Sequence, residues 1–198
     1  MKIMYLDLET TGLNYLDHQI IEIGCLLDDT TRPGVPINML PRLRLLVGRE
    51  NYSGHPIALA MHQKLFAEIG LLQKDRVNSY DLVSEENVAG RLANFLKANG
   101  IEKYITAGGK NVAGFDLRFL AQLPNFRQEG SRLVMYNHDI QIAQRVIDPA
   151  ILYFNPQTDT QLPDTNECLK RAGIEKQTDH TAIGDCKLIC ELVRRKDV

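Results

Sequence analysis

Three apolar segments near the amino terminus constrain the fold more than any other feature of this sequence. They span residues 2–8, 19–27 and 38–47, and each is rich in Ile, Leu, Val or Met. Glycine, asparagine and proline residues separate them, which is typical of β-strands joined by turns. Because both connections are short, we expect the three strands to pair as an antiparallel meander.

Helical periodicity takes over after the third segment. Pro56 precedes apolar residues at helical spacing, and Ser84 precedes two acidic residues and a second apolar stripe, as at a capped helix start. Further elements are expected along the chain: strands at 104–107 and 133–136, helices at 115–122, 164–172 and 182–195, and a loop at 148–163. This pattern predicts an α/β fold with a mixed five-stranded sheet flanked by helices.

The length and the net charge of the chain limit the classes of protein to which it can belong. The chain has 198 residues, with 23 Lys and Arg against 25 Asp and Glu, which gives a formal net charge of −2. A globular chain of this length supports one substantial core, so we expect a single domain over residues 1–198. The slight acidity argues against a protein that coats duplex DNA, because non-specific duplex affinity depends on Lys and Arg.

The apolar residues and the cysteines indicate a location. The first apolar stretch meets Asp7 and is too short for the core of a secretory signal, and no run approaches the roughly 18 residues that span a bilayer. The cysteines form no Cys-x-x-Cys pair, and Cys186 and Cys190 lie in an apolar helical pattern typical of buried thiols. We therefore expect a cytoplasmic protein that does not associate with membranes.

Two carboxylates close the first strand. Asp7 and Glu9 are two residues apart, so the period of a strand places both side chains on one face. Close carboxylates repel each other unless a cation lies between them, and Mg²⁺ takes oxygen ligands of this kind. A strand that simply ends in solvated acids is the alternative. The next segment favours a binding site over this alternative. It supplies two hydroxyls, backbone N–H groups and a glycine that allows a tight turn, all of which can hold a phosphate or nucleotide: Thr10-Thr11-Gly12-Leu13.

Two later segments also place acids where a binding site can form. Asp116 follows a glycine-rich turn that contains Lys110, and helix capping is its simpler role. Asp185 lies beside the apolar stripe of the last helix, where a carboxylate needs a partner such as a metal ion. Five residues of helix rotate by about 140° net, so His180 is expected in the loop that enters this helix rather than on the face of Asp185.

Taken together, these segments resemble the DEDDh 3'-5' exonucleases, the DnaQ-like branch of the RNase H-like superfamily. The first family motif, Asp-x-Glu-Thr-x-Gly-Leu, matches residues 7–13. The second, Asn-x(3)-Phe-Asp, matches residues 111–116, and the third, His-x-Ala-x-x-Asp, matches residues 180–185. The motifs occur in the family order over nearly the whole chain, which implies an RNase H-like sheet. Lys110 departs from the aromatic or His residue often found before the second motif.

The resemblance implies a site for two Mg²⁺ ions, or for Mn²⁺ in their place. The implied ligands are Asp7, Glu9, Asp116 and Asp185, with Asp7 shared between the ions. The charge of the site independently favours two cations. Four carboxylates and a substrate phosphate carry a large negative charge, and a single divalent cation would leave most of it uncompensated. In such sites one ion activates a water and the other stabilises the departing 3'-oxygen. His180 is the expected general base, since imidazole titrates near the operating pH.

The resemblance also implies contacts with the terminal nucleotide. The expected substrate-binding residues are Thr10, Thr11, Gly12, Leu13, Asn111 and Phe115. Leu13 would contact the base, and little sequence preference is expected because stacking tolerates any base. Outside the motifs, His55 is assigned to a substrate-facing loop and His62 to a helix surface. Glu22 stands among Ile residues in mid-strand and needs a partner or solvent.

The expected function is 3'-5' exonucleolytic hydrolysis of single-stranded nucleic acid, with DNA favoured and nucleoside 5'-monophosphates released. Oligoribonuclease-like trimming of short RNA is the alternative, because no motif locates recognition of the 2'-hydroxyl. Metal-dependent phosphatases and RNase H-type endonucleases use similar sites. A catalytically silent nucleic-acid-binding module would lack one or more of the five catalytic residues. A proofreading role would require a polymerase or replication partner.

Replacement of the expected general base tests its assignment. His180→Ala should lose most hydrolysis while it keeps metal and substrate binding, because the imidazole accepts a proton from water and is not an expected ligand. The measurement is the trimming of a labelled single-stranded oligonucleotide. Trimming at the wild-type rate by this variant contradicts the assignment.

Overall fold

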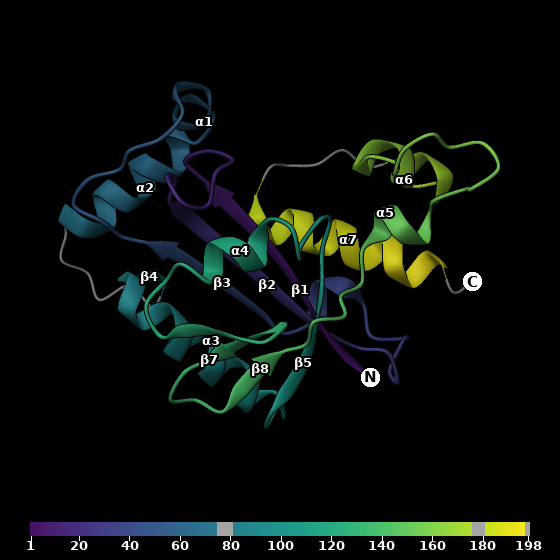
Figure 1. Ribbon diagram of the computed structural model, residues 1–198, viewed down its shortest axis with the longest axis horizontal. Coiled ribbons are helices and arrows are strands. Elements are labelled where there is room, and N and C mark those ends of the chain that lie inside the picture. Colours follow the sequence, from purple (N-terminus) through teal and green to yellow (C-terminus); the bar gives the residue numbers. More distant parts are fainter. Residues whose placement is uncertain (75–80, 176–180, 197–198) are drawn as a thin grey trace.

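A meander of three antiparallel strands begins the fold, as the sequence predicts (Figure 1). The strands are β1 (Lys2–Thr10), β2 (Ile20–Asp29) and β3 (Arg42–Val47). The computed structural model describes residues 1–74, 81–175 and 181–196. In these residues eight strands form one mixed sheet in the order β4-β3-β2-β1-β5-β8-β7-β6.

The sheet has more strands than the five expected. Two of the further strands, β5 (Tyr104–Gly108) and β7 (Arg132–Met135), correspond to those predicted from sequence. Three were missed: β4 (Leu82–Val83), β6 (Phe126–Glu129) and β8 (Ile140–Ile142). β4 and β8 are too short to show a pattern, and β6 is mostly polar and exposed. Pairing with neighbouring strands forms them, and pairing cannot be read from their own residues.

Helices cover both faces of the sheet. α3 (Glu85–Ala98) and α4 (Asp116–Leu120) pack on one face. The other face is covered by α7 (Ala182–Lys196), with α5 (Pro149–Leu152) and α6 (Thr165–Arg171) beside it. Figure 1 shows α7 with α5 and α6 on the side of the sheet away from α3. The apolar core therefore lies in two layers, one on each side of β1 and β2.

Three elements differ from the boundaries predicted from the sequence. The segment expected as a loop at 148–163 contains α5, because Asp148 accepts a hydrogen bond from the N–H of Ala150 at 2.8 Å and caps the helix. The helix after Pro56 is divided into α1 (Pro56–Met61) and α2 (Gln63–Lys74). The third strand begins at Arg42 rather than residue 38, since a short 3-10 helix, η1 (Ile37–Met39), precedes it.

An ion pair fastens the end of α7 to the sheet. Arg194 donates from Nε and Nη2 to the carboxylate of Asp28 on β2 at 2.9 and 2.6 Å, and the Asp28 side chain is 2% exposed. All four cysteines are buried free thiols, and for Cys186 and Cys190 this confirms the prediction. Among the described helices, none combines the length and the apolar character that crossing a bilayer requires.

Substitution of two neighbouring arginines tests how much this ion pair contributes to the free energy of unfolding. Arg194→Gln should lower the free energy of unfolding by about 3 kcal/mol, because the buried Asp28 carboxylate loses its counter-ion. Arg195, which is half exposed and pairs with Glu191 on the same helix, is the matched control. Arg195→Gln should change it by less than about 0.5 kcal/mol. Urea denaturation measures both, and equal losses would contradict the assignment.

Candidate active site

Alternation along β1 brings two carboxylates to the face that α7 covers. Tyr5 is buried against α7, and Asp7 and Glu9 continue the same side of the strand beyond it. Across the ladder, Asp7 faces Gly24 and Glu9 faces Glu22 of β2. The expected placement of both acids on one side of the strand is therefore found, and β1 continues to Thr10 instead of ending at residue 8.

The first turn of α7 supplies a third carboxylate. Asp185 lies three residues after Ala182, the first residue of the helix. The next residue, Cys186, is buried, and its thiol donates to the backbone oxygens of Tyr5 and Gly24 at 3.4 and 3.3 Å. The helix thus rests directly on β1 and β2, and this contact brings Asp185 beside the acids of β1.

The acids of β1 and α7 are close enough to share a cation. One carboxylate oxygen from each of Asp7, Glu9 and Asp185 lies within 4.8 Å of the others. Mg²⁺ and larger hard cations hold oxygens at about 2.1–2.6 Å, so their ligand oxygens lie up to about 5 Å apart. The separation and the chemistry of this donor set fit a hard divalent ion.

Asp116 lines the same cavity as Asp7 and Asp185, although it is not one of the three acids whose oxygens lie within 4.8 Å of one another. Strand β5 pairs with β1 only as far as Tyr5 and Gly108, and α4 begins beside the part of β1 beyond that pair. Asp116 is the first residue of α4, is 3% exposed and accepts a hydrogen bond from the backbone of Leu8. Its carboxylate therefore lies beside the end of β1, in the cavity that Asp7 and Leu8 also line.

Crowding changes the acidity of these groups. Burial raises the pKa of Asp7 to about 9, and repulsion by Asp116 and Asp185 adds to the rise. Burial also raises the pKa of Asp116 to about 8, although hydrogen bonds from the backbone oppose part of the effect. A divalent cation at this position would favour the charged forms and reverse both shifts.

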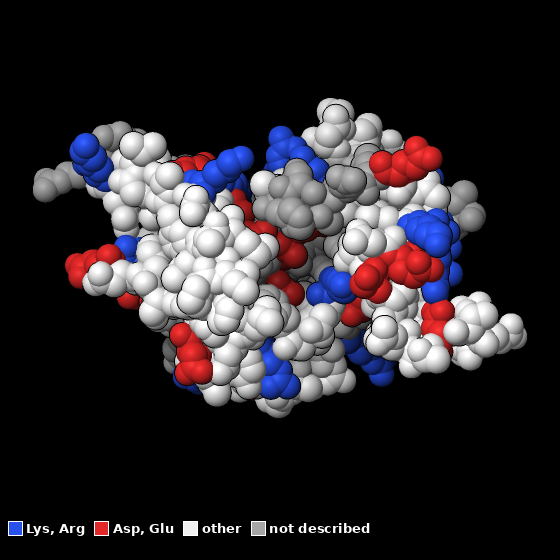
Figure 2. All heavy atoms as spheres, turned by 90° about the horizontal axis from the view of Figure 1, so that it is seen from above, with Lys and Arg blue, Asp and Glu red and all other residues white. Residues whose placement is uncertain are grey.

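The carboxylates open into a cavity of about 240 Å³. Asp7, Asp116 and Asp185 line it together with Lys110, which adds a cation to the rim. Figure 2 looks onto this face of the molecule and shows acidic side chains gathered inside a central hollow. The site thus combines a concave surface, hard oxygen ligands and a basic side chain.

The segment after β1 is a tightly bonded turn. The Thr10 hydroxyl donates to the backbone oxygen of Gly12 at 2.7 Å, and the Thr11 hydroxyl accepts from the N–H of Gln19 at 2.9 Å. Thr11 is completely buried. A Cβ on Gly12 would lie 2.5 Å from the ring of His18, so a larger residue there would require this ring to move. Both hydroxyls hold the turn together, and their contact with substrate stays a prediction.

The remaining expected residues lie in different settings. Leu13 is 84% exposed, whereas Asn111 and Phe115 line the cavity with the acids. Asn111 has a φ of +51°, and its N–H donates to Asp148 at 2.9 Å, which fixes the turn before α4. Their contacts with substrate stay predictions. His180, the expected general base, lies outside the described residues.

A histidine that was expected on a helix surface lies at the site. The His62 side chain is only 11% exposed, and its Nε2 lies 3.5 Å from Oε2 of Glu9. His55 instead caps α1, where its Nδ1 accepts from the N–H of Ile57 at 3.4 Å. Only the tertiary packing that brings His62 next to Glu9 decides which of the two histidines reaches an acid.

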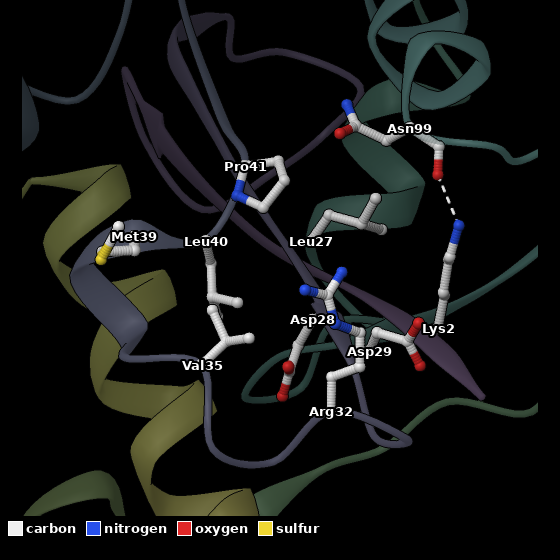
Figure 3. A pocket seen from close by; sticks show the side chains of 10 residues that line it. All are labelled: Lys2, Leu27, Asp28, Asp29, Arg32, Val35, Met39, Leu40, Pro41 and Asn99. Carbon is white, nitrogen blue, oxygen red and sulfur yellow. Dashed lines mark hydrogen bonds between the residues drawn. The ribbon is translucent and has the colours of Figure 1, made fainter.

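A second cavity, of about 420 Å³, lies at the opposite end of β1 and β2 (Figure 3). Lys2 donates to the backbone oxygen of Asn99 at 2.6 Å there, and Asp28 is paired with Arg194. The other residues that line it are Leu27, Asp29, Arg32, Val35, Met39, Leu40 and Pro41. Its buried carboxylate is neutralised within the fold, so the carboxylate cavity is the better candidate for chemistry.

Comparison with solved structures gives a likeness in fold. The crystal structure of E. coli Exonuclease I in complex with a dT13 oligonucleotide has a TM-score of 0.60 at 14% identity, over 98% of this chain and 40% of that chain. The zinc-bound form of the E. coli ExoI–ssDNA complex gives 0.59 at 14% identity, over 98% and 39%. The chain thus spans about 40% of the length of these structures. No protein-family model and no curated protein matches the sequence.

The raised pKa values predict a pH dependence in the metal-free protein. Asp7 and Asp116 keep their protons in the folded state up to about pH 8–9, whereas the unfolded chain releases them near pH 4. The stability that these two protonated groups contribute is therefore fully present below about pH 4 and is lost as the pH rises from there to about 8–9. In EDTA, the Tm of Asp7→Asn should exceed that of wild type by several degrees at pH 9, and the difference should shrink as the pH falls toward 4.

Thermal melts from pH 5 to 9 measure this difference. Glu102→Gln, which changes an exposed acid, is the control and should follow wild type throughout. Added Mg²⁺ should raise the wild-type Tm at high pH more than that of Asp7→Asn. A difference in Tm between Asp7→Asn and wild type that does not grow with pH in EDTA would contradict the raised pKa of Asp7.

Proposed function

We propose that this protein is a metal-dependent 3'-5' exonuclease that hydrolyses terminal phosphodiester bonds of single-stranded nucleic acid. The observation that carries the proposal is the meeting of Asp7 and Glu9 from β1 with Asp185 from α7, with one carboxylate oxygen of each within 4.8 Å of the others. Asp116 lines the same cavity. The order of the sequence motifs and a fold similar to that of E. coli Exonuclease I support the same conclusion.

The proposed ligands are the four acids, Asp7, Glu9, Asp116 and Asp185, and the proposed ions are two Mg²⁺, with Mn²⁺ as a substitute. When bound, such a pair of ions supplies an activated water and stabilisation of the leaving 3'-oxygen. Because ligands must be ionised, Asp7 and Asp116 release protons as the site is filled. The carboxylates then hold their charge next to the substrate phosphate without mutual repulsion.

The chain's own residues orient the substrate and move one proton. In this proposal His180 accepts a proton from the attacking water, and the water oxygen bonds to phosphorus as the bond between phosphorus and the 3'-oxygen breaks. The 3'-oxygen takes up a proton and becomes the 3'-hydroxyl of the shortened strand, and the nucleoside 5'-monophosphate leaves. Leu13 is exposed enough to contact a base, and Phe115 offers a ring within the cavity. Lys110 lines that cavity and is placed to attract the phosphate backbone.

DNA is the favoured substrate because the solved structures of similar fold are complexes with single-stranded DNA. Trimming of short RNA uses the same catalytic set, since contacts with phosphates and base faces need not read the sugar. Matched DNA and RNA oligonucleotides, compared in Mg²⁺, separate the two substrates. Faster trimming of DNA is the expected result.

An end-labelled assay tests the proposed activity. Wild-type protein with Mg²⁺ should shorten a 5'-labelled single-stranded oligonucleotide stepwise from its 3' end, and EDTA should abolish the reaction. Asp185→Asn should be at least about 100-fold slower, because it removes a ligand and partners of ligands alone contribute about 10–100-fold. Glu102→Gln, prepared in parallel, should retain full activity.

Substrates without a free 3' end provide the contrasting result. Circular single-stranded DNA and an oligonucleotide with a blocked 3' end should survive. Cleavage of either would indicate an endonuclease instead. Equal activity in wild type and Asp185→Asn would show that the reaction does not come from this site.

A further inference from the structure

Glu22 is a buried carboxylate that the proposed chemistry does not use. It lies on β2, is 0% exposed and faces Glu9 across the β1–β2 ladder. Its Oε1 accepts a hydrogen bond from Nε of Arg44, and its Oε2 accepts one from the backbone N–H of Ala182 at 3.0 Å. Because both oxygens are engaged, Glu22 binds the start of α7 rather than a metal ion.

The bond to Ala182 fixes the first turn of α7. The N–H groups at a helix start have no partner within the helix, and a carboxylate there also interacts favourably with the helix dipole. The Thr181 hydroxyl satisfies a second such group, the N–H of Gly184, at 3.1 Å. Asp185 follows in the same turn, so the position of Ala182 sets the position of the Asp185 backbone.

Close packing puts this turn at the level of the acids on β1. A Cβ on Gly24 would lie 2.4 Å from the carbonyl carbon of Ala182, so only glycine lets the helix approach β2 this closely. Gly24 is the ladder partner of Asp7, just as Glu22 is the partner of Glu9. Figure 1 shows the start of α7 beside β1 and β2.

Arg44 connects the buried carboxylate to a second helix. Its Nη1 and Nη2 donate to the two oxygens of Glu68 on α2 at 2.7 and 2.8 Å, while its Nε donates to Glu22. This arrangement offsets the charge of Glu22 and fixes the direction of its carboxylate. One carboxylate thus joins β2, β3, α2 and α7 next to the site.

We propose that Glu22 is a positioning residue for the metal-binding carboxylates. By anchoring Ala182, it holds Asp185 against Asp7 and Glu9. The inference rests on the proposed function, because it gives Glu22 a part in forming the metal site.

A second buried carboxylate on β2 sharpens the inference. Asp28 anchors the opposite end of α7 through Arg194. Two anchors therefore hold one helix on one strand, and they differ in their distance along the helix from Asp185. Only the anchor at Glu22 should influence metal binding, whereas both should contribute to stability.

Glu22→Asp tests the position of the carboxylate without changing its charge. The shorter side chain can no longer reach both Ala182 and Arg44. Binding of Mn²⁺ to the metal-free full chain, followed through the EPR signal of the free ion, should be at least about tenfold weaker than in wild type, because outer-shell partners contribute about 10–100-fold to metal affinity.

Arg194→Gln is the matched control. It removes the anchor at the far end of the same helix and should lower the Tm at least as much as Glu22→Asp. Its affinity for Mn²⁺ should stay within about twofold of wild type, as expected for a distant site. Equal losses of affinity in the two variants, or wild-type affinity in Glu22→Asp, would overturn the inference.

Gly24→Ala provides an independent route if Glu22→Asp does not fold. Its Cβ displaces the same turn with no change of charge, and a loss of affinity for Mn²⁺ of about tenfold is again expected. A wild-type protein that binds no Mn²⁺ would overturn the proposed metal site and this inference together. Wild-type binding with unaffected variants would overturn this inference alone.

Discussion

Repulsion among carboxylates that the fold holds together is the constraint on which the rest of this structure depends. Acids from β1, α4 and α7 share one cavity, and the close packing of α7 on β1 and β2 prevents them from separating. Proteins of this kind are stable by only about 5–15 kcal/mol, so such crowding requires protons or cations to offset it. The raised pKa values of Asp7 and Asp116 express that requirement.

β1 and α7 each have core residues that stabilise the fold in one part and acids of the candidate site in another. On β1, Tyr5 is packed against α7, and Asp7 follows on the same side of the strand. On α7, Cys190 is buried in the core, whereas Asp185 stands in the first turn. The core thus acts as a rigid support, and the acids occupy the first positions beyond it.

Sequence periodicity predicted the elements that bury their own apolar residues. The antiparallel meander and the helices α3 and α7 follow from such patterns. Alternation placed Asp7 and Glu9 on one side of β1, and the apolar stripe of the last helix placed Asp185 beside the core. The strands β4, β6 and β8 could not be predicted, because pairing rather than their own residues forms them.

Partners of polar residues were also beyond the sequence. Glu22 needed a partner, but the choice of Arg44 and Ala182 depends on how β3 and α7 pack. The approach of His62 to Glu9 likewise depends on tertiary packing. In both cases the residue type indicated a need, and only the tertiary structure shows how that need is met.

Anomalous diffraction from crystals grown with Mn²⁺ tests the central claim most directly, because the scattering locates the ions without reference to activity. Mn²⁺ peaks are expected within bonding distance of carboxylate oxygens of Asp7, Glu9, Asp116 and Asp185. Mn²⁺ bound elsewhere, with these four carboxylates free of it, would contradict the account.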